Sequence, residues 1–311
     1  MKKILLAVDG SACANDAASF LARLPHDEKL ELTVLTVLDD PAVVHGYAAT
    51  ISMNELVHKE KESALAAYQA VKARFLGSKV ELRSIIDMGH RGETIVRVAN
   101  DFDVELVIVG ARGHSMISRL ILGSTSDYVA THAHCSVLVV RPTGFLSAKR
   151  PLRVVVGYDS SGPAQAALEE FADIPWERDT EVHLVNVVAY MTGSFNDVVL
   201  DREPLLIAAR AEVAKAVRQL QSAVPSATGD VVDNEHAGEG LVRFAEDKQS
   251  DLIVVGEAHR SALRRFLLGS FSRYVLRHAP CSVWISRNRT IHGIGKREVD
   301  MTKQATELAA S

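Results

Sequence analysis

The sequence predicts two tandem doubly wound α/β domains, each with a five-stranded parallel sheet flanked by helices. Three observations lead to this fold class. The chain has 311 residues, which suggests about two domains at roughly 150 residues each. It repeats itself over about that distance. Within each repeat, apolar runs rich in β-branched residues alternate with helical patterns.

The internal repeat is clearest near the end of each half. Residues 132–141 read HAHCSVLVVR and residues 278–287 read HAPCSVWISR, which gives an offset of 146. The same offset aligns Gly110 with Gly256. A period of this length is too long for a solenoid repeat, so it indicates one domain that has been duplicated.

The repeat places the domain boundaries. We expect domains at residues 1–145 and 151–290, because Pro142 and Pro151 interrupt the pattern between them. The tail at 291–311 is polar and has no strand pattern, so disorder and a short helix both remain open.

The expected strands are short apolar runs. In the first repeat they lie at 3–8, 30–38, 80–86, 105–109 and 137–140. In the second they lie at 153–156, 181–188, 231–232, 252–255 and 282–285. Their nearly continuous hydrophobicity indicates strands that are buried on both faces, as in a parallel sheet.

Helical patterns separate these strands. In the first repeat they lie at 12–24, 54–76, 93–100 and 124–131. In the second they lie at 164–172, 204–223, 239–248 and 270–277. Alternation of this kind implies right-handed crossovers, and ligands then bind beyond the carboxyl ends of the strands where the strand order reverses.

Composition excludes several classes of protein. Hydrophobic residues make up 47% and charged residues 24%, which excludes collagen-like and wholly disordered chains. Aromatic residues are 5%, so we expect an aliphatic core. Residues 1–147 hold 15 basic and 17 acidic residues, and the remainder holds 20 and 22, so each half has a net charge of −2. Neither half is basic, which argues against nucleic-acid binding.

The cysteines and the N-terminus bear on location. Three cysteines are too few for a disulfide framework and fit a reducing compartment. The apolar run before Asp9 is too short for a signal peptide, and no run is long enough to span a bilayer. We therefore expect a cytoplasmic protein with no membrane span.

A glycine pattern follows the fourth strand of the first repeat. Gly110 and Gly113 allow a sharp turn and a close approach of backbone to ligand. Nine residues later, Gly123 and Ser124 begin the next helix, whose N-terminus attracts phosphate. Turn and cap roles alone are the other interpretation of these glycines.

This pattern, with LLAVDGS at 5–11 and HAHCSVLVV at 132–140, resembles the universal stress protein family. The resemblance covers residues 1–141 and 152–287. It implies a Rossmann-like fold similar to adenine nucleotide alpha hydrolases, with ATP as ligand, together with Mg²⁺. It places the nucleotide on these residues: Asp9, Val37, Val109, Gly110, Arg112, Gly113, Gly123, Ser124, Thr125 and Ser126. For Asp9, a ribose or Mg²⁺ contact and a role at a helix start both remain open.

The second repeat departs from the pattern. His259 stands where the second glycine would be, and Glu257 adds a negative charge beside it. We therefore expect nucleotide in the first domain only. The second domain then serves as a packing partner, binds a different ligand, or binds a metal through Asp159, Glu257 and His259. The residues that could bind a different anion are Arg260, Arg264 and Arg265.

The resemblance implies an ATP-binding sensor or scaffold in stress response. Slow ATP hydrolysis in the first domain is the alternative, with Asp9 or His114 as base; no dedicated catalytic group stands out. Pairing of 137–140 with 283–285 would make an internal pseudo-dimer, and a homodimer also remains open. The segments 39–53 and 189–203 are expected to be lids or plain surface loops.

The histidines and cysteines outside the glycine pattern have simpler interpretations. For His132, His134 and Cys135, a helix-end and strand-start role is favoured over zinc binding. Cys13 is the better candidate for a reactive thiol, because it lies in the first turn of a helix beside the expected site. An inert, structural Cys13 is the alternative.

Overall fold

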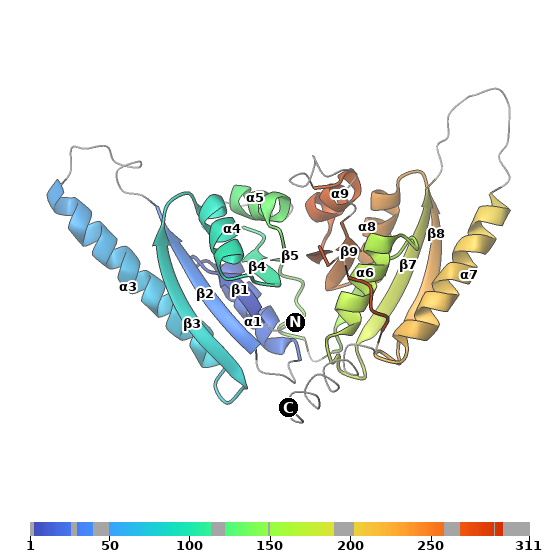
Figure 1. The fold of residues 1–311 in the computed structure, drawn as a ribbon, viewed down its shortest axis with the longest axis horizontal. Helices are drawn as coiled ribbons and strands as arrows, with labels where there is room; N and C mark the ends of the chain where they lie inside the picture. Colours follow the sequence, from blue (N-terminus) through green and yellow to red (C-terminus); the bar gives the residue numbers. More distant parts are fainter. Residues whose placement is uncertain are drawn as a thin grey trace, which may run out of the picture. The chain divides into compact units, whose positions relative to one another are not determined.

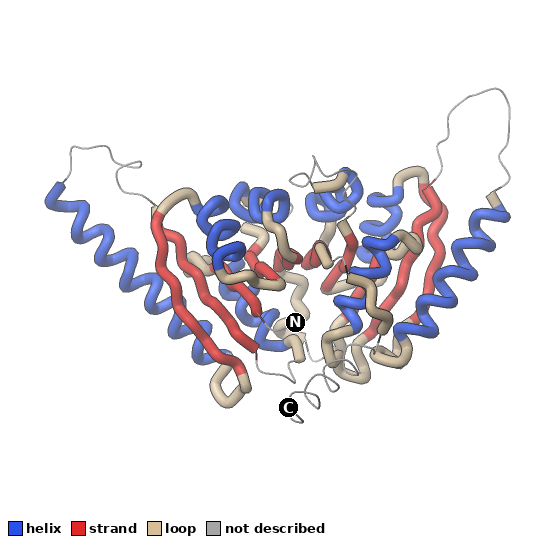
Figure 2. Tube along the Cα trace, viewed as in Figure 1, coloured by secondary structure: helices blue, strands red, loops and turns tan. Residues whose placement is uncertain are grey.

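The computed structural model describes residues 3–25, 30–39, 50–112, 122–148, 150–189, 202–257, 268–288 and 290–294. The chain divides into two units, the first built mainly from residues up to Ala148 and the second mainly from those after it. In each unit, helices flank a sheet (Figures 1 and 2). The α/β fold expected from the sequence is confirmed in both.

The first unit contains a parallel sheet with the strand order β3-β2-β1-β4-β5. The strands are β1 (Lys3–Ala7), β2 (Leu30–Leu38), β3 (Val80–Met88), β4 (Leu106–Gly110) and β5 (Ser136–Val140). The chain moves from β1 outward to β3 and then returns to the other side of β1. The strand order therefore reverses between β1 and β4, which is where ligands bind in such sheets.

Four helices pack on this sheet. They are α1 (Ala12–Arg23), α3 (Thr50–Arg74), α4 (Arg91–Asp101) and α5 (Ser124–His132). The helix α1 packs against α3 and β4, whereas α4 packs against α5 and β2. The central strands are buried almost throughout, and their largest enclosed side chains include Leu5, Leu6, Ile108 and Leu138. The expected aliphatic core is confirmed for these strands, whereas the two largest fully buried side chains that the structure describes, Trp284 and Phe171, are aromatic.

The turn from β1 into α1 is fixed by two side chains. The Ser11 hydroxyl accepts a hydrogen bond from the Ala14 N–H at 3.2 Å and caps the helix. Asp9 Oδ1 accepts the Ser11 N–H at 3.0 Å. Gly10, between them, has a φ of 77°, a conformation that costs glycine little. These contacts hold Asp9 at the carboxyl end of the sheet.

The second unit repeats the arrangement, with the parallel order β9-β6-β7-β8. The strands of the second repeat are β6 (Arg153–Gly157), β7 (Glu181–Ala189), β8 (Thr228–Asn234), β9 (Leu252–Gly256) and β10 (Ser282–Ser286), the last of which is divided between the two units. Its helices are α6 (Gly162–Ala172), α7 (Glu203–Leu220), α8 (Ala237–Asp247) and α9 (Ser270–His278). Directly after β9, the Glu257 N–H donates to the Ser286 carbonyl, as the Ala111 N–H donates to Val140 in the first unit.

Candidate functional site

A pocket lies at the carboxyl ends of β1, β2 and β4, where the strand order of the first unit reverses. It encloses about 70 Å³. Its lining residues are Ala7, Val8, Asp9, Ala14, Leu35, Val37, Arg91, Ile95, Val109, Gly110, Arg112, Thr125 and Ser126. This is the position at which doubly wound domains hold their ligands.

Most of the residues proposed from the sequence meet at this pocket. Seven of them line it: Asp9, Val37, Val109, Gly110, Arg112, Thr125 and Ser126. Gly123 and Ser124 lie beside them at the start of α5. Gly113 and His114 fall outside the described residues.

Gly110 is required for packing between elements. A Cβ at this position would lie 2.7 Å from the backbone carbonyl of Cys13, so a side chain would push α1 away from β4. In the second unit, a Cβ on Gly256 would lie 2.3 Å from the Pro163 carbonyl oxygen. Both repeats therefore need this glycine for the seating of their first helix, whether or not a ligand approaches.

The first turn of α5 is tied to the end of β4. The Ser126 hydroxyl donates to the Gly110 carbonyl at 2.6 Å, and the Gly123 N–H donates to the Ala111 carbonyl at 2.8 Å. The N–H groups of the first turn of any helix have no acceptor within that helix. The fold thus holds the N-terminus of α5, with Thr125, at the edge of the pocket.

Asp9 has a structural role that is common to both repeats. In the second unit, Asp159 Oδ1 accepts the Ser161 N–H at 3.0 Å, as Asp9 does with Ser11. The interpretation of Asp9 as a helix-start residue therefore has direct support. Asp9 also lines the pocket, so the same carboxylate is placed beside any ligand there.

Arg91 is a pocket residue that the sequence interpretation missed. It is the first residue of α4, and its guanidinium donates two hydrogen bonds to Asp39, at 3.1 and 2.7 Å. Its side chain is 42% exposed, so it keeps access to solvent. The aligned position of the second repeat holds Ala237. Comparing the repeats position by position would have singled out Arg91 as a difference between the two clefts.

The second unit uses its acidic residue differently from our expectation. The Glu257 carboxylate is 1% exposed and forms an ion pair with Arg287, which is 3% exposed. From the sequence, Glu257 was expected to add a negative charge beside His259 and was one of three candidate metal ligands; the carboxylate is instead taken up by the buried Arg287. The aligned position in the first unit is Ala111.

The metal site proposed for the second domain loses one of its three groups, Glu257, to another contact. Glu257 pairs with Arg287, and Asp159 holds the start of α6. His259 and the nearby arginines Arg260, Arg264 and Arg265 lie outside the described residues. Among the residues that the structure does describe, no three His, Cys, Asp or Glu side chains gather as a metal site.

Tyr158 is a further difference between the two repeats. It occupies the position of the pocket residue Val8, and its hydroxyl donates to the Gln165 side chain at 3.1 Å. Burial raises the pKa of the Tyr158 hydroxyl above its ordinary value. The first cleft therefore has a small apolar side chain where the second has a buried phenol.

The helix-end role of the histidines is confirmed for His132. Its Nδ1 lies 2.8 Å from the Tyr128 carbonyl, and its ring stacks on Tyr128 at 4.0 Å. His278 repeats both contacts with Tyr274. Cys13 and Cys135 are partly buried, Cys281 is buried, and all three are free thiols.

These observations define a class of protein: a tandem pair of Rossmann-like α/β domains, the first with a pocket at its topological switch point. The model of the universal stress protein family matches residues 1–141 and again residues 152–287. The chain belongs to this family, as two tandem domains.

Similar proteins agree with this assignment. A universal stress protein of Mycolicibacterium smegmatis is 28% identical over 293 residues, covering 92% of this chain and 97% of the relative. Universal stress protein YxiE of Bacillus subtilis is 28% identical over 145 residues, covering 45% of this chain and 98% of the relative. The crystal structure of a universal stress protein from Archaeoglobus fulgidus has the same fold, with a TM-score of 0.63, 20% identity, and coverage of 92% and 96%.

Among the described residues, no helix combines the length and the apolar character that crossing a bilayer requires.

Proposed function

We propose that the first domain, residues 1–145, binds ATP and that the protein is a nucleotide-dependent sensor or scaffold in stress response. The observation that carries this proposal is the pocket at the switch point, where Arg112, Thr125 and the N-terminus of α5 meet apolar side chains. Cationic and N–H donors suit phosphates, and apolar walls suit a base.

Each part of the pocket has chemistry that suits one part of a nucleotide. Val37, Leu35 and Ile95 supply apolar surface for the adenine. Asp9, as a hydrogen-bond acceptor, suits a ribose hydroxyl. Arg112 and the first turn of α5 suit the phosphates, because guanidinium groups and helix N-termini both favour anions.

The residues of the pocket could hold Mg²⁺ that binds together with the nucleotide. Mg²⁺ usually binds through one or two carboxylates together with substrate phosphates and water. Asp9 is a carboxylate on the pocket wall, which is consistent with this kind of binding. In this proposal Asp9 helps to hold the ion, and the ion neutralises the phosphate charge.

The sensor role follows from the energetics of binding. A ligand shifts a conformational or partner equilibrium only by its differential affinity for the two states.

The second domain, in this proposal, binds no nucleotide and contributes as a packing or interaction partner. At the aligned positions of the second repeat, other residues replace two arginines and a threonine of the first pocket. The aligned pairs are Arg91 with Ala237, Arg112 with Ala258, and Thr125 with Phe271.

Calorimetric titration of Mg-ATP tests the proposal. Thr125→Phe introduces the residue that the second repeat has at this position. It should abolish binding, because the phenyl ring would occupy the space beside the N-terminus of α5 where the phosphates are proposed to lie. Thr125→Ser keeps the hydroxyl and should bind as the unmodified protein does. If a folded Thr125→Phe protein bound ATP with unchanged affinity, the proposed site would be wrong. Quantifying ADP after long incubation separates a binding module from a slow hydrolase.

A further inference from the structure

A second cavity lies on the other side of α1 from the nucleotide pocket and shares no lining residue with it. Its volume is about 590 Å³, within the usual range of roughly 300–1,000 Å³ for small-molecule sites. Its lining residues come from α1, the end of α3, and the segment after β5: Asp16, Ser19, Phe20, Ala22, Arg23, Arg74, Val140, Arg141, Pro142, Thr143, Gly144, Leu146 and Ser147. All of them belong to the first unit.

Three arginines and one aspartate are among the residues that line this cavity. Arg74 donates to the Ser19 hydroxyl at 3.0 Å and to the Asn15 side-chain oxygen at 3.3 Å. Both partners are neutral, so these contacts orient the guanidinium without cancelling its charge. Burial raises the pKa of Asp16 above its ordinary value, although the nearby Arg74 opposes this shift.

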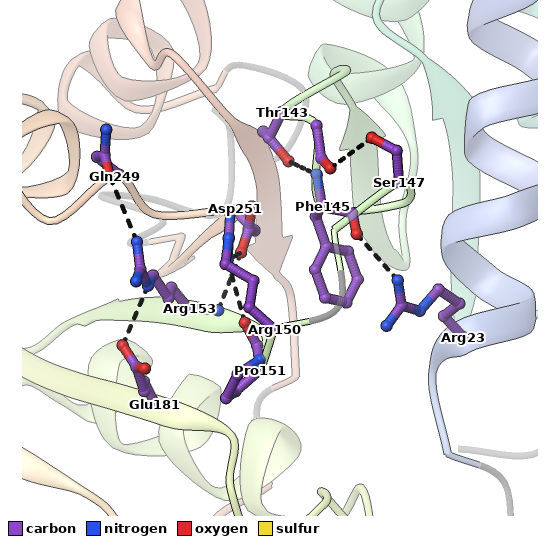
Figure 3. Close-up of polar contacts among 11 residues, drawn as sticks. Arg23, Thr143, Phe145, Ser147, Arg150, Pro151, Arg153, Glu181, Gln249 and Asp251 are labelled. Carbon is purple, nitrogen blue, oxygen red and sulfur yellow. Dashed lines mark hydrogen bonds and ion pairs between the residues drawn. The ribbon is translucent and has the colours of Figure 1, made fainter.

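Arg23 fixes the wall that the segment after β5 contributes. Its guanidinium lies 4.1 Å from the centre of the Phe145 ring and donates to the Phe145 carbonyl at 2.9 Å (Figure 3). Within that segment, the Ser147 hydroxyl donates to the Gly144 carbonyl at 2.9 Å, so the turn is held by its own contacts. The wall is therefore ordered without a ligand.

Arg141 adds a deeply buried charge. It is 5% exposed, and burial lowers the pKa of its guanidinium; Cys281 raises this pKa, and the positive charge of Arg112 lowers it. Arginine nevertheless stays charged at any working pH.

The aligned surface of the second unit has the opposite charge. Where α1 has Ser19, Phe20 and Arg23, the helix α6 and its C-cap have Glu169, Glu170 and Asp173. Glu169 accepts the N–H groups of His292 and Gly293 at 2.6 and 3.0 Å, so residues of the chain itself occupy this surface. Among the basic residues of the cavity, Arg23 is replaced by Asp173 in the second repeat, whereas Arg141 has a basic counterpart in Arg287.

We propose that this cavity is a second ligand site, which takes a small organic anion bearing phosphate or carboxylate groups. Guanidinium forks match both groups in geometry and charge. The space suits a metabolite-sized molecule. The site is separate from the nucleotide pocket, and it does not depend on the function proposed above.

Inorganic pyrophosphate and citrate are the two probes, one for each anionic group. Each is titrated into the Thr125→Phe protein, in which the nucleotide pocket is blocked, while backbone NMR signals of Thr143–Ser147 are followed. We expect at least one probe to shift these signals with saturation at millimolar concentration, and the stronger probe identifies the preferred group.

Two pairs of variants locate the site. Arg74→Gln should weaken the affinity for the probe by about tenfold or more, because a charge-assisted hydrogen bond is lost. Lys72→Gln removes the same charge from an exposed position on the same helix and should leave affinity unchanged. Ser147→Glu should abolish binding by repulsion, whereas Ser147→Gln should not.

Thermal unfolding shows whether each variant is folded. The proposal is overturned if neither probe shifts the Thr143–Ser147 signals. It is equally overturned if folded Arg74→Gln and Ser147→Glu proteins bind as tightly as their controls.

Discussion

The two domains share their framework and differ in the charges around it. Both begin their first helix with an aspartate and a serine cap, and both need a glycine at the end of the fourth strand for that helix to pack. In the first domain, arginines line an open pocket. In the second, the acidic Glu257 is buried against Arg287. Duplication has kept the residues that build the fold and several that line the pocket, and it has changed Arg91, Arg112 and Thr125, which a ligand would meet.

The largest expected effect comes from breaking the buried pair of the second domain. Glu257→Ala leaves Arg287 buried without this partner, and removal of one member of such a pair costs about 3–5 kcal/mol of unfolding free energy. Denaturant unfolding followed by circular dichroism measures this loss. Glu257→Ala combined with Arg287→Leu should recover part of it. A single substitution that costs nothing would show that the pair does not stabilise the domain.

Making the first cleft resemble the second should have the next largest effect. Arg91→Ala together with Arg112→Ala removes two cations and should weaken ATP by about 100-fold, since each charge-assisted hydrogen bond contributes roughly 1.5–3 kcal/mol. Arg97→Ala removes a similar charge from the exposed face of α4 and should have little effect. Unchanged ATP affinity in the double variant would show that the two arginines do not contribute to nucleotide binding.

The shared helix caps should give similar losses in both domains. Ser11→Ala and Ser161→Ala each remove a hydroxyl that accepts the N–H three residues later, at a cost of about 1 kcal/mol. Differential scanning calorimetry of the two variants compares the domains directly. A loss confined to one domain would mean that the conserved contact geometry does not carry the same energy in both.

The smallest expected effect is a gain. Ser160 has a φ of 61°, and its aligned residue Gly10 has a φ of 77°. Ser160→Gly should stabilise the protein by about 0.5 kcal/mol, because left-handed strain is relieved while some chain entropy is lost. Ser160→Ala keeps the strain and removes the hydroxyl, so it should not stabilise. If Ser160→Gly destabilised the protein, the Ser160 hydroxyl would contribute more to stability than the left-handed backbone costs.

The fold was predictable because its strands are mostly apolar runs. The exception is β8, which was expected at 231–232 and extends over Thr228–Asn234. It is an edge strand, and polar residues such as Asp230 and Asp233 interrupt the apolar run from which strands are identified. The strand β3 is also an edge strand without buried positions, but its apolar residues Val80, Leu82, Ile85 and Ile86 were enough to predict it.

The pocket was predictable where one local segment builds it and hidden where distant segments meet. Gly110, Arg112 and Thr125 come from the pattern that follows one strand. Arg91 comes from a different helix, so only the folded chain brings it to the same pocket. The pairing of Glu257 with a residue 30 positions away was hidden for the same reason.

The most direct test of the contrast between the domains is the number of ATP molecules bound per chain, measured by native mass spectrometry with calorimetry. The account predicts one ATP per unmodified chain and none in the Thr125→Phe variant. Two equivalent ATP molecules per chain, or one that persists in folded Thr125→Phe, would contradict it.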